Sequence, residues 1–479
     1  MDDYGRLALT VAVVAAVATS GAAAWGWQQQ QPPLAPCMYV FGDSLVDNGN
    51  NNNILSLARA NYRPYGIDFH EGPPGRFTNG RTMVDFISDM LRLRPPLLPP
   101  YATARPEDLP RGVNFASGAS GILPDTGNNL GGHYPFSEQV DHFRAAVSDM
   151  GNRSEFRGNA TKLADHLGRC IFYVGMGSND YLNNYFMPDY YDTARRYSPR
   201  DYAALLLQGY STQITQLHGL GARKFVIAGV GLIGCIPYEL ARMNDDDSRP
   251  SGPNDNQSAA SQEDIAISIG IGGGGGGGGG GVGVGGGGGS GGGVGGGGGS
   301  DGGDDWRSPS MPPPYADGGN GNADGGNGNG NSSGSRTGTG STNPTPTGGG
   351  GSCNETINSA IDIYNRGLLA MVKRLNNRGG LRGAKLVFLD TVQSGKDLMA
   401  NAAAHGFAVL DRGCCGVGRN NGQITCLPLQ RPCDDRGKYM FWDAFHPTEA
   451  AHRIYAAKAF GSNSTAEVYP INISQLAAI

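Results

Sequence analysis

The chain has 479 residues and a formal net charge of −5. Its 37 lysines and arginines are scattered, without the basic cluster that nucleic-acid binding requires, so that class of function is excluded. Of its 80 glycines, 42 lie within residues 243–352, where runs of glycine cannot form a hydrophobic core. The rest of the chain is long enough for one large domain or two small ones.

The N-terminus has the layout of a secretory signal peptide. Arg6 precedes an apolar run at residues 7–18, and small residues follow up to Ala24, so residues 1–24 are predicted to be a cleaved signal peptide. The alternative is a membrane anchor, but about 12 apolar residues are too few to span a bilayer. We therefore expect a secreted protein, extracellular or in the cell wall, with no transmembrane segment after cleavage.

Cysteines and glycosylation sequons agree with secretion. The chain has eight cysteines, an even number that fits a disulfide-bonded secreted protein. Seven Asn-x-Ser/Thr sequons would become glycosylation acceptors in that compartment. They begin at Asn152, Asn159, Asn256, Asn331, Asn354, Asn463 and Asn472. Because the pattern is short, the sequons support secretion only together.

Short apolar runs alternate with helix-period segments along the chain. The runs predicted to be strands are residues 38–41, 113–116, 170–174, 224–228 and 385–389. The predicted helices are residues 81–93, 199–217 and 357–375, with a last one from Pro447 to about residue 460. Such alternation predicts an α/β domain with a mainly parallel sheet, whose functional loops lie at the carboxyl ends of the strands.

The glycine-rich segment at residues 243–352 falls between a predicted strand and a predicted helix, so we interpret it as an insertion in one domain. We place this domain at residues 35–465. The composition of the insertion predicts disorder, and a structured glycine-rich cell-wall element is the alternative. No repeat of about 20 to 50 residues is visible, which argues against a solenoid.

The loop after the first predicted strand offers a nucleophile. The segment 41–50 reads FGDSLVDNGN, in which Ser44 follows the strand and Gly42 permits a sharp turn. A lone Gly-Asp-Ser is weak evidence, because Ser44 could simply cap a following helix.

Two further strand-end loops offer hydrogen-bond donors. Gly118 lies in NFASGASG at residues 114–121, whose small residues let backbone N–H groups approach a ligand or merely form a tight turn. Asn179 lies in GMGSNDY at residues 175–181 and brings a side-chain amide, although Asn-Asp is also a common turn pair.

The segment WDAFHP at residues 442–447 changes this assessment. Asp443 lies three residues before His446, where its carboxylate can fix the imidazole tautomer and stabilise the imidazolium. Ser44, His446 and Asp443 then supply nucleophile, base and orienting acid. The backbone N–H groups of Ser44 and Gly118 and the Asn179 amide supply three oxyanion donors.

On these four blocks the chain resembles the plant-type GDSL esterases/lipases of the SGNH hydrolase superfamily. Ser44 is at that family's nucleophile position, Gly118 and Asn179 are at its oxyanion positions, and Asp443 with His446 form its Asp-x-x-His. Further family-like stretches are RFTNGR at 76–81, GCIP at 234–237 and CCG at 414–416. The likeness runs from about residue 37 to 460, except in the glycine-rich segment, which replaces a short loop of the family.

The resemblance implies a three-layer α/β/α, flavodoxin-like domain and a secreted esterase or lipase that hydrolyses carboxylic esters through an acyl-enzyme. Its substrate would be a small-molecule or lipid ester. The alternatives are an acyltransferase or carbohydrate deacetylase with the same triad, or a non-catalytic glycine-rich cell-wall protein. We expect no cofactor and no metal. The Gly-x-Ser-x-Gly matches at Ser290 and Ser300 lie in polyglycine and are interpreted as chance.

The cysteines are expected to be bridged. Cys37 and Cys170 lie in or beside strands that could be neighbours, and Cys235 and Cys353 flank the insertion and could meet. The other four, from Cys414 to Cys433, cluster within 20 residues without a defined pairing.

Overall fold

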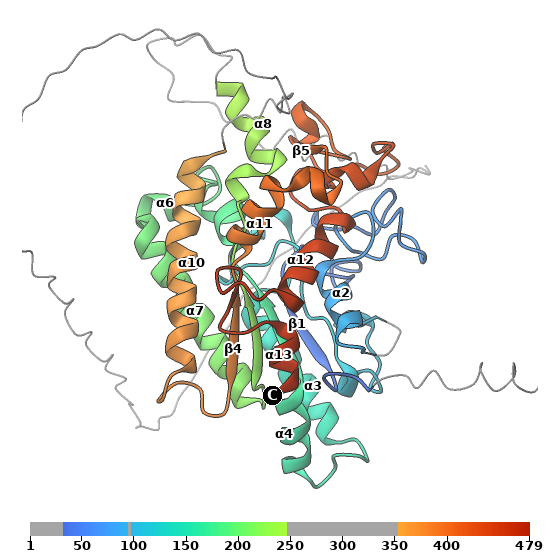
Figure 1. The fold of residues 1–479 in the computed structure, drawn as a ribbon, viewed down its shortest axis with the longest axis vertical. Helices are drawn as coiled ribbons and strands as arrows, with labels where there is room; N and C mark the ends of the chain where they lie inside the picture. Colours follow the sequence, from blue (N-terminus) through green and yellow to red (C-terminus); the bar gives the residue numbers. More distant parts are fainter. Residues whose placement is uncertain (1–31, 94–96, 247–352) are drawn as a thin grey trace, which may run out of the picture. The chain divides into compact units, whose positions relative to one another are not determined.

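The computed structural model describes residues 32–93, 97–246 and 353–479 (Figure 1). The predicted signal peptide, the predicted disorder of residues 247–352, and the serines at 290 and 300 lie outside the described residues. Among the helices that are described, none has both the length and the apolar composition needed to cross a bilayer.

The main sheet has the strand order β1-β2-β3-β4-β7. Its strands are β1 (Met38–Gly42), β2 (Ile171–Gly175), β3 (Lys224–Ala228), β4 (Lys385–Leu389) and β7 (Val468–Tyr469). Strands β1 to β4 run parallel, and β7 pairs antiparallel with β4 at the edge. The prediction of a mainly parallel sheet is therefore confirmed. A separate parallel pair is formed by β5 (Val409–Gly413) and β6 (Tyr439–Phe441).

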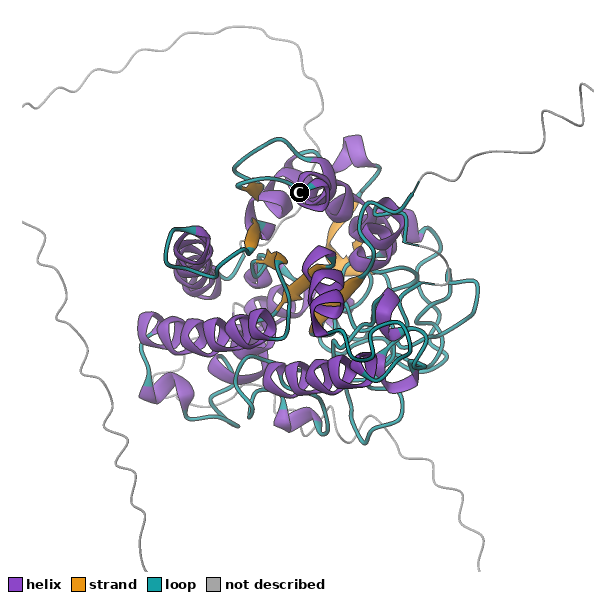
Figure 2. Ribbon diagram, turned by 90° about the horizontal axis from the view of Figure 1, so that it is seen from below, coloured by secondary structure: helices purple, strands orange, loops and turns teal. Residues whose placement is uncertain are grey.

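Helices lie on both faces of this sheet (Figures 1 and 2). The α-helices are α2 (Met83–Met90), α3 (Phe136–Gly151), α4 (Ala160–Arg169), α5 (Ser178–Asp180), α6 (Thr193–Arg196), α7 (Pro199–Gly219), α8 (Pro237–Asp246), α10 (Glu355–Asn376), α11 (Thr391–Ala400), α12 (Glu449–Gly461) and α13 (Ile473–Ala478). A π-helix, η4 (Tyr181–Tyr185), follows α5. The short 3-10 helices are η1 (Tyr101–Thr103), η2 (Leu109–Arg111), η3 (Asn128–Leu130), η5 (Ile233–Cys235), η6 (Ala402–His405), η7 (Arg419–Asn421) and η8 (Arg436–Lys438).

The strands divide their side chains between two cores because successive residues of a strand point to opposite faces. On one face, Tyr39 and Phe41 of β1 join a cluster with apolar residues of α3, α7 and α10. On the other face, Met38 and Val40 join a cluster with residues of α2, α12 and α13. The result is the expected three-layer α/β/α fold.

The predicted strand at residues 113–116 forms only isolated bridges. Val40 N–H donates to Val113 O, and Phe115 N–H donates to Val40 O, so the segment does run parallel to β1. The ladder continues with the Ser117 N–H donating to Gly42 O, but it is interrupted between these bonds because the Gly42 N–H donates to Gln139 Oε1 instead of Phe115 O.

The last predicted helix also needs correction. It begins at Glu449 rather than Pro447, since Thr448 is the N-cap and its side chain accepts from the Ala451 N–H. The fold also continues past residue 465, where the sequence analysis ends the domain, because β7 and α13 contribute Val468, Ile473 and Leu476 to a core cluster.

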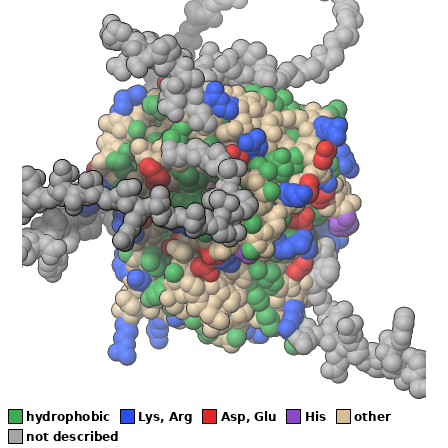
Figure 3. Space-filling view, turned by 45° about the horizontal axis from the view of Figure 1, so that its top comes forward, with side chains coloured by type: hydrophobic (Ala, Val, Ile, Leu, Met, Phe, Trp, Pro, Cys, Tyr) green, Lys and Arg blue, Asp and Glu red, His purple; other side chains and the backbone are tan. Residues whose placement is uncertain are grey.

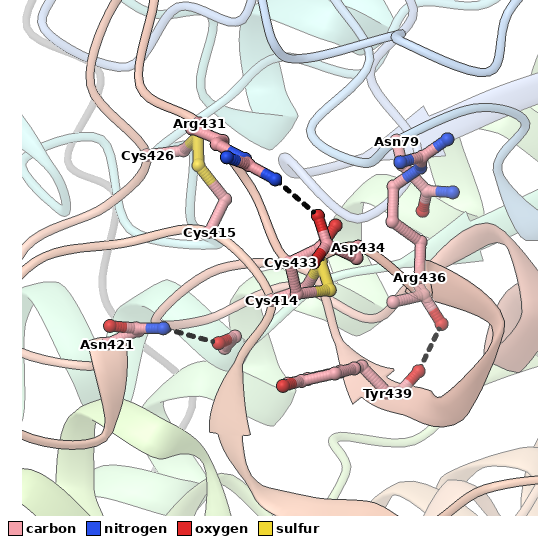
Figure 4. The surroundings of a disulfide bond; sticks show 12 residues. Asn79, Cys414, Cys415, Asn421, Cys426, Arg431, Cys433, Asp434, Arg436 and Tyr439 are labelled. Atoms are coloured by element: carbon pink, nitrogen blue, oxygen red, sulfur yellow. Dashed lines mark hydrogen bonds and ion pairs between the residues drawn. A yellow bond between two sulfur atoms is a disulfide. The ribbon is translucent and has the colours of Figure 1, made fainter.

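Four disulfides link the cysteines: Cys37–Cys170, Cys235–Cys353, Cys414–Cys433 and Cys415–Cys426. The first two are the pairs anticipated from the sequence. The other two lie close together (Figure 4). They are next to the loop that carries Asp443, since the Cys415 N–H donates to Trp442 O at 2.7 Å.

Surface charge on the face drawn in Figure 3 is mixed. Lysines and arginines alternate there with acidic and uncharged side chains. This agrees with the scattered charge of the sequence.

Candidate active site

Ser44 lies in the loop that directly follows β1. Gly42 precedes this loop, and a Cβ there would lie only 2.5 Å from Val46 Cγ2 and 3.1 Å from the backbone of β2. The chain turns sharply after it, with the Val46 N–H donating to Asp43 O at 3.2 Å. No helix begins at this loop, so the alternative that Ser44 caps a helix is wrong. Ser44 is half-buried and remains accessible.

Ser44, His446 and Asp443 form a continuous hydrogen-bonded chain. His446 Nε2 lies 2.8 Å from Ser44 Oγ, and His446 Nδ1 lies 2.8 Å and 2.9 Å from the two carboxylate oxygens of Asp443. Because an ionised carboxylate only accepts hydrogen bonds, we assign the imidazole proton to Nδ1. Nε2 then accepts from the Ser44 hydroxyl, so the three residues are brought together with the polarity of a nucleophile, a base and an orienting carboxylate.

Asp443 is fully buried yet remains ionised. Burial by itself would raise the pKa of this carboxyl, but the charge of His446 and hydrogen bonds from His446, Tyr65 and the Phe445 N–H outweigh it and hold the pKa below its ordinary value. The backbone N–H groups of Phe445 and His446 donate to Oδ1 at 2.9 and 2.8 Å. The carboxylate can therefore support a positive charge on His446.

The family-like stretch RFTNGR at residues 76–81, for which no role was predicted, contacts the His446 loop and holds it in place. The Phe77 ring lies on the His446 ring with centroids 5.1 Å apart. Thr78 Oγ1 donates to Pro447 O at 3.0 Å, and Asn79 Oδ1 accepts from the Glu449 N–H at 2.8 Å. Residues 77–79 thus pack against one face of the imidazole ring and bind the backbone at the start of α12.

Asn179 lies beyond the end of β2, which is aligned with the end of β1 by the pairing of Gly42 with Gly175. Its amide Nδ2 donates to Ser120 O at 3.0 Å, and its Oδ1 accepts from Asn183 Nδ2 at 2.7 Å. These two bonds set the orientation of the amide. The second Nδ2 hydrogen has no partner among the described residues.

The Gly118 N–H, predicted above to be an oxyanion donor, already has a hydrogen-bond partner. It donates to the buried Asp47 Oδ2 at 2.9 Å. Burial raises the pKa of Asp47 to about 6, against the hydrogen bonds it receives from Gly49, Gly118 and Asn50. The next residue, Ala119, has a left-handed φ of 68°. Within the described residues, neither the Ala119 N–H nor the Ser44 N–H has a hydrogen-bond partner.

Two buried side chains that were not predicted to be functional position these loops. Gln139 of α3 accepts from the Gly42 N–H at 3.0 Å and donates to Gly42 O at 2.9 Å, which clamps the backbone ahead of Ser44. Asp180 accepts from the Ile122 N–H at 2.8 Å and so holds the loop that follows Gly118. The sequence reveals neither role, because both side chains bond to backbone groups far away in the sequence.

The described residues contain one cluster with metal-ligand chemistry. The ligand atoms of Cys37, His166 and Cys170 lie within 4.8 Å of one another. Both cysteines are in a disulfide, so neither offers the thiolate that binds a metal.

The chain is similar to known proteins over most of its length. A family model described as "GDSL-like Lipase/Acylhydrolase" matches residues 38–264 and 317–459. A GDSL esterase/lipase of Arabidopsis thaliana is 44% identical over 450 residues, which cover 94% of this chain and 93% of the relative. Another from the same plant is 38% identical over 446 residues, which cover 93% of this chain and 86% of the relative.

Proposed function

The chain belongs to the GDSL-like lipase/acylhydrolase family and is a carboxylic ester hydrolase, and from this premise we propose that it is a secreted serine esterase with a Ser44–His446–Asp443 triad. The alternative of a non-catalytic glycine-rich protein is wrong, since family membership makes the chain an enzyme. The observation that carries the proposal is the 2.8 Å contact of Ser44 Oγ with His446 Nε2, continued by the contact of His446 Nδ1 with Asp443.

The first half of the reaction forms an acyl-enzyme. Ser44 Oγ attacks the ester carbonyl carbon while His446 Nε2 takes the hydroxyl proton. Asp443 remains ionised and stabilises the imidazolium. The tetrahedral intermediate collapses when His446 returns this proton to the departing alkoxide. Water then attacks the acyl-enzyme by the same steps and releases the acid.

Three donors would stabilise the oxyanion: the N–H groups of Ser44 and Ala119 and the free Nδ2 hydrogen of Asn179. Ala119 takes the place of Gly118 because the Gly118 N–H is bonded to Asp47. Preorganised donors of this kind act on the charge that develops in the transition state.

The substrate proposed is a small-molecule or lipid ester met outside the cell. The relatives that the chain resembles are named esterases/lipases. The four disulfides suit an oxidising compartment. The layout of residues 1–24 supports secretion.

Covalent labelling tests the proposal directly. The purified protein should hydrolyse a chromogenic short-chain ester, and a fluorophosphonate probe should inactivate it by reacting with one serine. Mass spectrometry of the labelled peptides should place the adduct on Ser44. Inactivation with the adduct on another residue, or full ester turnover after complete labelling of Ser44, would contradict the assignment.

Replacing Asn179 with alanine should lower kcat by about 10²- to 10³-fold with little change in KM, because an oxyanion donor acts mainly in the transition state. The matched control is Asn183→Ala, which leaves Asn179 in place but removes the donor to its Oδ1. We expect the control to lose less activity than Asn179→Ala. A loss confined to KM would assign Asn179 to substrate binding instead.

A further inference from the structure

A tyrosine distant in sequence completes the hydrogen bonding of Asp443. Tyr65 Oη donates to Asp443 Oδ2 at 2.5 Å, although 378 positions separate the two residues. Tyr65 is 1% exposed and contacts the rings of Phe77 and Trp442 edge-on, with centroids 6.1 and 6.3 Å away. The hydroxyl is thus fixed toward the carboxylate by its aromatic surroundings.

Tyr65 supplies the one donor to Asp443 that comes from outside the 443–446 loop in the described part of the chain. Oδ1 receives the N–H groups of Phe445 and His446 as well as Nδ1. Oδ2 receives only His446 Nδ1 and Tyr65. Without Tyr65, one oxygen of a fully buried carboxylate would depend on the catalytic imidazole alone.

We propose, on the basis of the triad proposed above, that Tyr65 is a positioning residue that holds Asp443 Oδ2 and sets the acidic limit of the enzyme's pH range. Tyr65 does not touch the reacting atoms and acts through Asp443.

The direction of the effect follows from charge alone. The Asp443–His446 pair carries one negative charge when it is active and none after it has taken up a proton. A hydrogen bond from Tyr65 stabilises the negative form more than the neutral one, wherever the proton lies within the pair. Removing the hydroxyl should therefore let the pair take up its inactivating proton at a higher pH.

Tyr65 remains a donor throughout this range. Burial first, and then the charge of Asp443, raise the pKa of Tyr65 well above its ordinary value, so the hydroxyl keeps its proton. The donor strength is therefore constant while the pair titrates.

Other titratable groups also face the pair. Asp43 follows β1, and burial raises its pKa to about 6, opposed by the Leu45 N–H and the charge of His446. His452 of α12 is buried, which lowers its pKa to about 3, and it also senses His446. Burial first, and then the charge of Asp443, raise the pKa of Tyr62 to about 12. A substitution at Tyr65 leaves all three in place.

The test compares Tyr65→Phe with the matched control Tyr62→Phe. Tyr62 packs edge-on against Tyr65 at 5.3 Å, but its hydroxyl donates to Cys426 O at 2.9 Å. The pH profile of kcat/KM is measured for both variants and the parent enzyme. In Tyr65→Phe the acidic limb should move to higher pH by about half to one unit, with KM nearly unchanged. In Tyr62→Phe it should stay in place.

A limb that coincides with the parent profile, moves to lower pH, or moves equally in Tyr62→Phe would overturn the role of Tyr65. Tyr65→Met provides a second donor-free variant, because methionine adapts to irregular apolar space. It should shift the limb in the same direction as phenylalanine. Full turnover in Ser44→Ala would instead overturn the triad itself, so the two failures are distinguishable.

Discussion

Replacing Ser44 with alanine should reduce ester turnover by several orders of magnitude and leave the fold intact. The covalent route disappears with the hydroxyl, and only about 10³- to 10⁴-fold acceleration over water should remain from the oxyanion donors and binding. Folding should not change, because the hydroxyl is half-buried and its hydrogen bond goes to His446 Nε2.

The measurement is turnover of a short-chain ester by the purified variant, with its melting temperature determined beside that of the parent. The fluorophosphonate probe should no longer label the protein. Wild-type turnover in a correctly folded Ser44→Ala protein would show that Ser44 is not the nucleophile, whatever its distance from His446.

The strand-end loops could be predicted from the sequence because their chemistry follows from topology. Buried parallel strands read as short apolar runs, and the carboxyl ends of neighbouring strands meet at one edge of a sheet. Ser44 follows β1 and Asn179 follows β2, and these two strands are paired in register. His446 was predicted in a different way, because Asp443 lies three residues before it.

The engagement of individual donors could not be predicted in this way. Gly118 looked like an oxyanion donor because its loop is rich in small residues, yet the buried Asp47 takes its N–H. The sequence gives no sign of this bond, because Asp47 and Gly118 are 71 positions apart and meet only after the loops fold together. The roles of Tyr65 and Gln139 could not be predicted for the same reason, because their partners Asp443 and Gly42 are far away in the sequence.

The start of α12, the helix that follows His446, was also predicted wrongly from the sequence. Proline is common at the first position of a helix, which favoured a start at Pro447. Thr448 has an extended conformation and caps the helix, while the Pro447 carbonyl accepts from Thr78. Threonine is itself a favoured N-cap residue, so the cap at Thr448, and not the proline before it, sets the start of α12.

Replacing Asp443 with asparagine should lower kcat by about 10³- to 10⁴-fold while the protein stays folded. Two backbone N–H groups donate to Oδ1, so the amide oxygen of asparagine should keep that position and Nδ2 should replace Oδ2. Nδ2 would then lie 2.9 Å from His446 Nδ1, where the carboxylate oxygen now lies.

An amide nitrogen in this place donates, which favours the tautomer in which His446 Nδ1 accepts and the ring proton lies on Nε2, against the attraction of the amide oxygen 2.8 Å from Nδ1. Nε2 can then no longer accept the Ser44 proton, which removes the base without moving an atom. Tyr65 does not oppose the change, because its hydroxyl oxygen can accept from Nδ2.

Ester turnover and melting temperature of Asp443→Asn should be measured beside Asp443→Ala, which leaves a cavity and unpaired N–H groups. The asparagine variant should be nearly as inactive as the alanine variant but more stable, and a loss of less than about tenfold in kcat would contradict the role of Asp443 in fixing the tautomer.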